Sequence, residues 1–412
     1  MRYEQNLQWL FDKLPIYNKI IKRSSKSRLD KIIKFCEALK SPEITFTSIH
    51  LTGTNGKGST GHLIASILQE AGYRTGIFSS PHLVDFRERI KCNGNLISKE
   101  FITTFVESHR RMIEHYSLSF FEIITIMSFS FFYDKLVDIA IVETGLGGRL
   151  DSTNIIFPIL SIITNVNFDH IDILGKTLRK ISIEKAGIIK NRIPVIIGSF
   201  SYETISIFKK VSKEKCSSIY FIPYFFNKLL YESPLKADYQ RYNQQIVLQT
   251  IKFLRTKLWK ISSKNLLDGF KNIIFNTGFK GRWEILSRNP LIICDTAHNE
   301  DGISLIVEQL SKEPANSLRL VLGFVKGKDI TKMLSYFPQY AIYYFCQPHL
   351  EKALSIETLK EITKNLFTKS SYFRSLTNAF SQAKQDADIK DVTFVGGSTF
   401  VVSEILVDGR LV

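Results

Sequence analysis

Short apolar, β-branched segments alternate with amphipathic segments along most of this chain, from about residue 46 onward. The segments 46–52 (FTSIHLT), 75–80 (TGIFSS) and 137–143 (VDIAIVE) have the length and composition of buried strands. Strands that alternate with helices form βαβ units, whose sheets are largely parallel. The sequence therefore predicts an α/β fold. The further strands that we expect lie at 159–164, 194–198, 291–295, 318–324, 341–346 and 391–397.

The length of the chain indicates more than one domain. With 412 residues, the chain exceeds what one ordinary hydrophobic core organises, so two domains are expected. Gly278 and Gly281 interrupt the strand and helix pattern, and a second strand–helix series begins after them. We therefore predict domains over residues 1–280 and 281–412.

Composition restricts the partners and the compartment. The net charge of +16 comes from 55 Lys and Arg against 39 Asp and Glu, but these basic residues are scattered, so no nucleic-acid partner is expected. The five cysteines lie far apart without a C-x-x-C pair, as is typical of reduced thiols. The apolar run at 120–133 contains Glu122 and is shorter than the ~18 residues of a membrane span. We expect a cytoplasmic monomer that does not associate with membranes.

The segment GTNGKGST at 53–60 lies between a predicted strand and a predicted helix. It differs from the common phosphate-binding pattern G-x-x-x-x-G-K-[ST], because Gly58 separates Lys57 from Ser59. In this position, backbone N–H groups and the start of a helix both point at phosphates. We predict that Lys57 reaches the transferable phosphate and that Ser59 or Thr60 offers a hydroxyl to Mg²⁺. Gly58 is expected to let the backbone turn closely around the phosphate before the helix starts.

Polar residues follow three further strands of the first series. Ser80, Glu143 and the pair Asp169-His170 each come just after a predicted strand, at the edge where open α/β sheets bind ligands. Mg²⁺ prefers oxygen ligands that include one or two carboxylates, so Glu143 is a candidate ligand. Ser80 fits a metal ligand or a hydroxyl that caps a loop equally well. Lys185 alone would be an ordinary solvated helix residue.

The second half contains one comparable segment, DTAHN at 295–299. It follows the expected strand 291–295 and is expected to open a helix, which would place Asp295 and His298 at i and i+3 on one side. The pair could hold a metal or clamp a substrate, or Asp295 could simply cap the helix.

Taken together, these motifs resemble those of the folylpolyglutamate synthases and bifunctional dihydrofolate synthases, members of the Mur-type ATP-dependent amide ligases. The resemblance covers nearly the whole chain, and SSPHL with GLGGRLD is typical of the folate branch. The interposed Gly58 is this superfamily's form of the loop. The motifs that occur in the family's order are GTNGKGST, SSPHL, ETGLGGRLDSTN, DH at 169–170, EKAG, YQRYN at 239–243, GRWE at 281–284, DTAHN and GGS at 396–398.

The resemblance implies an activity and a domain plan. It implies ligation of L-glutamate to dihydropteroate and to folates, with ATP and one or two Mg²⁺ ions and through an acyl phosphate intermediate. Residues 1–280 would form a P-loop ATP-binding domain with a mostly parallel sheet, and residues 281–412 a smaller, Rossmann-like glutamate-ligase domain. The partners would be small molecules only: ATP, dihydropteroate or a reduced folate, and L-glutamate.

The resemblance also implies roles for individual residues. The residues that would contact ATP are Gly53, Thr54, Asn55, Gly56, Lys57, Gly58, Ser59, Thr60, Asn243, Arg282 and Asp295. Magnesium would be held by Ser59, Ser80, Glu143 and His170. The folate substrate or glutamate would contact Pro81, His82, Phe121, Asp151, Asn154 and Ser398. The catalytic set would be Lys57, His170, Lys185, Asp295 and His298, with Lys185 as the lysine that the family carbamylates.

Two segments depart from the family's pattern. Gly327-Lys328-Asp329 stands where D-K-D is common, and Glu351-Lys352-Ala353 stands where P-R-A is frequent. Lys and Arg bind carboxylates differently, so glutamate affinity or inter-domain contacts are expected to differ.

Two other functions fit parts of the pattern. A monofunctional folylpolyglutamate synthase would carry the same motifs but would not glutamylate dihydropteroate. A P-loop NTPase that acts on a partner, such as a nucleic acid, would also carry the loop, although the interleaved aromatic and basic residues typical of single-strand binding are missing.

Overall fold

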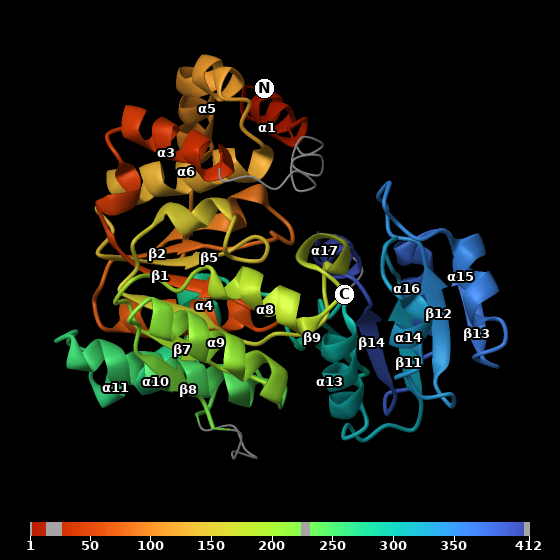
Figure 1. Ribbon diagram of the computed structural model, residues 1–412. Helices are drawn as coiled ribbons and strands as arrows, with labels where there is room; N and C mark the ends of the chain where they lie inside the picture. The colour runs from red at the N-terminus through yellow and green to blue at the C-terminus, as the bar shows by residue number, and fades with distance from the viewer. Residues whose placement is uncertain (1, 14–26, 224–230, 408–412) are drawn as a thin grey trace. The chain divides into compact units, whose positions relative to one another are not determined.

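The computed structural model describes residues 2–13, 27–223 and 231–407, and the chain divides into two compact units (Figure 1). Most of the first unit precedes residue 280, and most of the second follows it. Two short segments from the earlier part of the chain also belong to the second unit. The first unit comprises Met1–His82, Phe86–Pro234 and Gln240–Phe279, and the second comprises Leu83–Asp85, Leu235–Tyr239 and Lys280–Val412.

The first unit is built on a sheet that has eight strands within the described residues, in the order β4-β3-β2-β5-β1-β6-β7-β8. The strands from β2 to β8 in this order pair in parallel, whereas β3 and β4 extend one edge antiparallel. Parallel strands joined by helices are what the alternating sequence pattern predicts. The strands are β1 Thr47–Thr52, β2 Thr75–Phe78, β3 Ile90–Cys92, β4 Asn95–Leu96, β5 Ile139–Glu143, β6 Leu160–Ile163, β7 Val195–Ile197 and β8 Ile219–Phe221.

Helices cover both faces of this sheet. Helices α4 and α10 pack on one face, and α6 packs on the other, with α3 and α5 outside it (Figure 1). The helices of the unit are α1 Arg2–Phe11, α3 Ser27–Ala38, α4 Lys57–Glu70, α5 Lys99–His115, α6 Phe120–Asp134, α7 Ile171–Leu174, α8 Leu178–Ala186, α9 Tyr202–Glu214, α10 Gln240–Thr256, α11 Ser263–Lys271 and α12 Ile273–Thr277. Short 3₁₀ segments are η1 Pro42–Ile44, η2 Phe86–Arg89 and η3 Ser152–Ile155.

Helix α6 accounts for the most apolar run of the sequence. Ser119 and Glu122 form a capping box at its start, in which the Ser119 backbone N–H donates to Glu122 Oε2 over 2.7 Å. Nearly every side chain of the helix is buried, which is why it is apolar all round. In the ranges that the structure describes, no helix is long and apolar enough to cross a membrane.

The second unit has a six-stranded sheet in the described residues, in the order β13-β12-β11-β14-β10-β9, parallel except for β9. Side chains alternate between two cores: α13, α14 and α15 pack over Ile293 and Leu320, and α16 and α17 pack over Ile292 and Val321. The elements are β9 Glu284–Arg288, β10 Leu291–Cys294, α13 Glu300–Leu310, β11 Leu318–Leu322, α14 Ile330–Leu334, β12 Ile342–Cys346, α15 Ile356–Thr363, β13 Ser370–Phe373, α16 Leu376–Gln385, β14 Val392–Gly396 and α17 Thr399–Val407. The predicted α/β class with two mostly parallel sheets is confirmed.

Candidate active site

The glycine-rich loop joins β1 to α4, as the sequence predicts. Gly56 caps the helix with φ 81°, and a Cβ atom there would lie 2.4 Å from Asn243 Oδ1, so glycine is required by both conformation and space. The expectation for Gly58 is wrong, because the helix already begins at Lys57 and Gly58 lies in its first turn. A Cβ on Gly58 would lie 3.4 Å from the ring of Phe279, which is ordinary van der Waals contact.

Lys57 lies beside a carboxylate. Its Nζ is 4.0 Å from Glu143 Oε1, and it donates to the carbonyl oxygens of Gly53 (2.9 Å) and Thr54 (3.3 Å) in its own loop. Glu143 is 5% exposed at the end of β5. The loop therefore holds a cation and an anion together at the start of a helix, whose dipole adds roughly half a positive charge.

Side-chain hydrogen bonds from the residues after β6 hold the loop in shape. Asn165 Oδ1 accepts the N–H groups of Thr54 (3.1 Å) and Asn55 (2.8 Å), and the Thr164 hydroxyl donates to the Asn55 carbonyl over 2.6 Å. Sequence reasoning missed Asn165. The available signal was its position directly after a strand that lies beside the loop strand.

Helix α10 supplies the side chains that line the start of α4. Gln240 Nε2 donates to Ser59 Oγ over 3.2 Å, and Asn243 Nδ2 donates to Gln240 Oε1 over 2.8 Å. The Thr60 hydroxyl reaches Asn243 Oδ1 at 3.4 Å. Both hydroxyls are buried, so the structure brings Asn243 to the loop across 183 residues of sequence, together with Gln240.

The register of the sheet sets the remaining polar residues along one edge. Phe78 pairs with Val142 and Leu51 with Glu143, so Ser80, two residues beyond β2, leaves the sheet at the same edge as Glu143. Thr52 pairs with Ile163, which brings the end of β6 to this edge as well. Neighbouring strands lie about 4.8 Å apart.

His170 follows β6 in the chain and is the N-cap of α7. It has φ 49°, its side chain is 49% exposed, and Nε2 lies 3.8 Å from Asp169 Oδ2. Within the described ranges, no three His, Cys, Asp or Glu side chains gather as a metal-binding group. The predicted set of Ser59, Ser80, Glu143 and His170 would rely on hydroxyls for half of its ligands, and its assembly stays a prediction.

Lys185 is buried in the last turn of α8, 3% exposed. Burial lowers the pKa of its amine well below the usual value, and repulsion from Lys57 lowers that pKa further, while Asp169 and Asp151 oppose the shift. The amine is therefore disposed to be neutral. The solvated helix lysine that its sequence alone suggests is not what the structure contains.

The segment after β5 packs against the helix that carries Lys185. A Cβ on Gly148 would lie 2.9 Å from the Glu184 carbonyl oxygen, and a Cβ on Gly187 would lie 2.3 Å from Arg149 Cα. The Arg149 N–H donates to the Glu184 carbonyl over 2.7 Å. The segment and the helix therefore pack closely at two glycines: Gly148 of the segment contacts the backbone of the helix, and Gly187 at the end of the helix contacts the backbone of the segment.

Asp151 and Asn154 organise the turn at the end of this segment. Asp151 caps η3 by accepting the Thr153 N–H over 3.0 Å, and its other oxygen accepts the Leu146 N–H over 2.9 Å. Asn154 Nδ2 donates to the carbonyls of Arg149 (3.1 Å) and Gly187 (3.0 Å). Both side chains are buried and form these hydrogen bonds with backbone groups of other residues.

Aromatic rings border the same segment. Phe121 is buried beside Phe78, with ring centroids 5.7 Å apart, and its ring covers Gly145, where a Cβ would lie 2.4 Å from it. Pro81 is exposed, and His82 Nδ1 accepts a hydrogen bond from Arg89 Nε at 2.7 Å. Since Arg can only donate, the His82 proton lies on Nε2.

In the second unit, Asp295 is buried at the end of β10. It accepts hydrogen bonds from Tyr239 Oη (2.6 Å), the Trp283 N–H (2.7 Å) and the Ala297 N–H (2.8 Å). Burial raises the pKa of its carboxyl, and Arg282 and these donors oppose that rise. The carboxylate is thus held by donors on several sides. Arg282 itself donates to Thr296 Oγ1.

The expected geometry of Asp295 and His298 on one helix side is wrong. Helix α13 begins at Glu300 and is capped by Asn299, whose side chain accepts the Gly302 N–H over 2.9 Å. The segment from Asp295 to His298 is therefore a loop: Asn299 makes the capping bond, while bonds to Tyr239 and Trp283 occupy the Asp295 carboxylate. His298 Nδ1 lies 3.0 Å from the Thr296 carbonyl and donates to it.

Ser398 follows β14 at the start of α17 and is 1% exposed. Its hydroxyl accepts the Val401 N–H over 3.2 Å, as a capping residue does. A role for Ser398 in substrate binding stays a prediction.

Comparison with known proteins gives these two units a family. Residues 51–253 match the Mur ligase middle domain, and residues 281–399 match the Mur ligase glutamate ligase domain. The dihydrofolate synthase/folylpolyglutamate synthase of Escherichia coli is 31% identical over 388 residues, with 90% of this chain and 88% of that protein covered. The chain belongs to the dihydrofolate synthase/folylpolyglutamate synthase family. Members of this family are ATP-dependent amide ligases, and so is this chain.

Solved structures of family members superpose on this chain over nearly its whole length. The folylpolyglutamate synthase of Mycobacterium tuberculosis, solved with ADP, gives a TM-score of 0.86 at 25% identity and covers 96% of this chain and 98% of its own. A bifunctional synthase solved with Mn, AMPPNP and L-glutamate gives 0.79 at 27% identity, with 92% and 93% covered. As in its family, the ligase uses ATP and a divalent metal ion.

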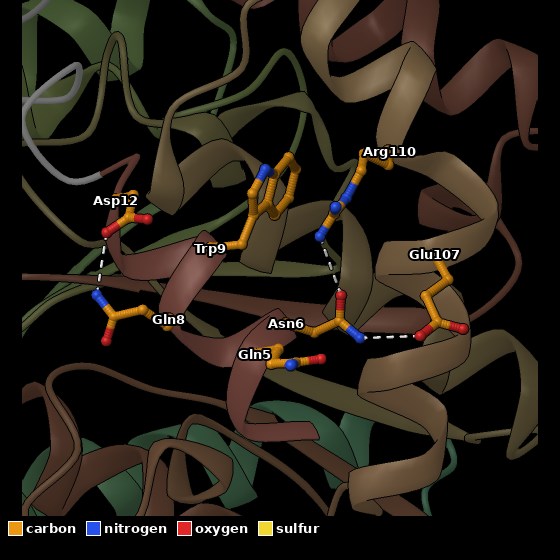
Figure 2. Close-up of a pocket in the computed structure, with 7 residues that line it drawn as sticks. All are labelled: Gln5, Asn6, Gln8, Trp9, Asp12, Glu107 and Arg110. Atoms are coloured by element: carbon orange, nitrogen blue, oxygen red, sulfur yellow. Dashed lines mark hydrogen bonds between the residues drawn. The ribbon is translucent and has the colours of Figure 1, made fainter. Parts of the chain in front are cut away.

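A pocket of about 600 Å³ between α1 and α5 contains none of the predicted site residues of the ligase (Figure 2). Arg110 Nη2 donates to Asn6 Oδ1 over 3.2 Å, Asn6 Nδ2 donates to Glu107 Oε1 over 3.1 Å, and the Arg110 guanidinium lies 4.7 Å from the Trp9 ring. These contacts join the two helices, so we interpret the pocket as structural. It is lined by Gln5, Asn6, Gln8, Trp9, Asp12, Glu107 and Arg110.

Proposed function

We propose that this chain ligates L-glutamate to dihydropteroate and to the γ-carboxylate of folates, through an acyl phosphate formed with ATP. A carboxylate is a poor electrophile, and phosphorylation gives it a good leaving group that the glutamate amine can displace. The observation that supports this proposal most is the clustering of Lys57, Glu143 and the buried Lys185 at the carboxyl edge of the first unit's sheet. Such a cluster suits charge neutralisation during phosphoryl transfer.

We assign the two substrates to two domains, residues 1–280 for ATP and residues 281–412 for glutamate ligation. ATP phosphates would bind the loop Gly53–Thr60, where Lys57 would exchange its bonds to loop carbonyls for bonds to phosphate oxygens. Asn243 would complete this site from α10. Arg282 would contact ATP from its own loop, and Asp295 and His298 would contact ATP or glutamate.

The donor set near the loop fits magnesium. The Ser59 hydroxyl and the Glu143 carboxylate are buried oxygen donors, and Mg²⁺ takes few protein oxygens beside phosphate and water. We propose that Ser59, Ser80, Glu143 and His170 hold one or two ions. The ion would neutralise phosphate charge. Glu143 also fixes the position of the Lys57 ammonium in this arrangement.

Carbamylation of Lys185 is a further part of the proposal. A neutral amine adds CO₂ to give a carbamate and a released proton, and burial together with Lys57 favours the neutral amine. The carbamate would be an anion next to the Lys57 ammonium. The interaction with Lys57 would therefore change from the repulsion of a protonated amine to the attraction of an anion.

The folate end of the substrate would lie along the segment after β5. Phe121 offers a flat apolar ring, and the turn at Asp151 and Asn154 offers a polar edge that suits a pteridine. Pro81 and His82 would border the pteridine, and Ser398 would contact the glutamate substrate. We expect the ligase to act as a cytoplasmic monomer on small molecules only.

The decisive test offers the purified chain ATP, Mg²⁺ and radiolabelled L-glutamate with either dihydropteroate or tetrahydrofolate, and identifies the products by mass. Glutamate incorporation with both acceptors is the expected result. Incorporation with tetrahydrofolate alone would identify a monofunctional folylpolyglutamate synthase. ADP release that ignores glutamate and both acceptors would contradict the proposed ligase activity.

A further inference from the structure

His50 lies in the middle of β1 and is completely buried. Its Nε2 is 2.8 Å from Thr153 Oγ1, and Thr153 Oγ1 is 2.6 Å from Asp151 Oδ1. The two oxygens of Asp151 already accept N–H groups from Thr153 and Leu146, as a carboxylate does. The Thr153 hydroxyl therefore donates to Asp151, and its oxygen accepts from His50 Nε2–H.

This chain of bonds fixes the state of the His50 ring. The proton lies on Nε2, and Nδ1 is buried without a hydrogen-bond partner. Burial lowers the pKa of the imidazole to about 3, and repulsion from Lys190 contributes to the shift. His50 is therefore a neutral ring that makes one directed hydrogen bond.

The unsatisfied Nδ1 indicates that packing alone does not account for a histidine at position 50. A buried acceptor without a partner costs about 1 to 3 kcal/mol, and an apolar side chain of similar size would avoid that cost. Val142, which pairs with His50 on the neighbouring strand β5, belongs to the apolar core that also contains the side chains of α6. The directed bond to Thr153 is the one polar interaction that a leucine or methionine could not supply.

The bond acts on the turn that the folate substrate is proposed to contact. Asp151 caps η3 at the start of this turn, and Asn154 ties its end to the Arg149 and Gly187 carbonyls, next to the helix of Lys185. Lys190 Nζ donates to the Asn154 carbonyl over 2.6 Å on the same turn. A shift at Thr153 would therefore move Asp151 and the whole turn.

We propose that His50 is a positioning residue for the pteridine end of the substrate, acting through the Thr153 hydroxyl on the Asp151 carboxylate and its turn. The inference rests on the proposed function, because it assigns the turn at 151–154 to the pteridine. Loss of one such bond corresponds to about a tenfold change in a binding constant. The effect should fall on the pteridine substrate and not on ATP, since the glycine-rich loop is held by Asn165 and Thr164 instead.

Two matched pairs of variants test the inference. His50→Met and Thr153→Val keep the approximate volume and remove the hydrogen bond, whereas His50→Gln and Thr153→Ser keep a donor or a hydroxyl in place. We expect His50→Met and Thr153→Val to raise the KM for dihydropteroate by about tenfold and to leave the KM for ATP within about twofold. The conservative variants should have a KM for dihydropteroate close to that of the wild type. The double variant should be no worse than either single variant, because both break the same relay.

The outcomes separate the inference from the proposed function. If the wild type itself does not join glutamate to dihydropteroate, the same KM series is run with tetrahydrofolate, and failure with both overturns the function. An unchanged pteridine KM in a folded His50→Met or Thr153→Val variant overturns the positioning role. An equal rise in the KM for ATP and for the pteridine also overturns it, since that result indicates general destabilisation. Should His50→Met not fold, the Thr153→Val and Thr153→Ser pair decides.

Discussion

The buried His50 predicts an acid-sensitive component of stability. Its pKa is lowered from 6.5 to about 3, so the folded chain binds this proton less readily than the unfolded chain. The stabilisation from the neutral ring is therefore complete above about pH 6.5 and is lost as the pH falls toward 3. Each pH unit inside this window changes the free energy of unfolding by about 1.4 kcal/mol, which amounts to about 2 kcal/mol at pH 5 and about 5 kcal/mol over the whole window.

The assay compares urea unfolding of the wild type and of His50→Gln at pH 7.5 and pH 5.0. The variant lacks the titrating ring, so we expect the free energy of unfolding of the wild type to fall by about 2 kcal/mol more than that of His50→Gln. His115→Gln removes an exposed histidine of α5 and serves as the control, which should follow the wild type. Equal losses in the wild type and His50→Gln would refute the reasoning.

Further predictions concern the site itself. Glu143→Gln should abolish glutamate-dependent ADP release while leaving the urea midpoint unchanged, and wild-type turnover by this variant would remove Glu143 from the metal site. Gly56→Ala places a Cβ 2.4 Å from Asn243 Oδ1 at φ 81°, so the KM for ATP should rise by about tenfold or more in steady-state assays, and an unchanged KM would show that this contact is dispensable. Turnover in CO₂-depleted buffer should fall and should recover with added bicarbonate, because the pKa of the Lys185 amine is lowered; no response to bicarbonate would argue against a carbamate. Chelation by EDTA should stop turnover, Mg²⁺ should restore it, and undiminished activity in EDTA would contradict a metal requirement.

Much of the fold could be predicted from the sequence, because buried parallel strands carry a strong local signal. Segments such as 137–143 and 318–324 are rich in Ile, Val and Leu, and they contain β5 and β11, which lie inside their sheets and not at an edge. The strands that the pattern missed lie at or toward the sheet edges. β4 has two residues and β9 is only partly buried along its length, so neither carries an apolar run.

The site could be predicted only in part, because its contacts join distant segments. Lys57 and Glu143 were recognisable from the strand ends that carry them, whereas the bonds of Asn165 to the loop depend on the pairing of β1 with β6. The start of α13 was misplaced because Asp295 and Asn299 are both good capping residues, and tertiary bonds to Tyr239 and Trp283 occupy Asp295. The relay through His50 needs the three-dimensional distances, since 103 residues separate it from Thr153.

The reciprocal fit of Gly148 and Gly187 restricts how this ligase can be re-engineered. Each glycine lies so close to the opposite backbone that any larger residue would push apart the segment after β5 and the helix of Lys185. A graft that aims to change acceptor preference by exchanging residues 144–155 alone would therefore also displace the lysine. Residues 144–155 and 184–188 form one transplantable unit and should be exchanged together.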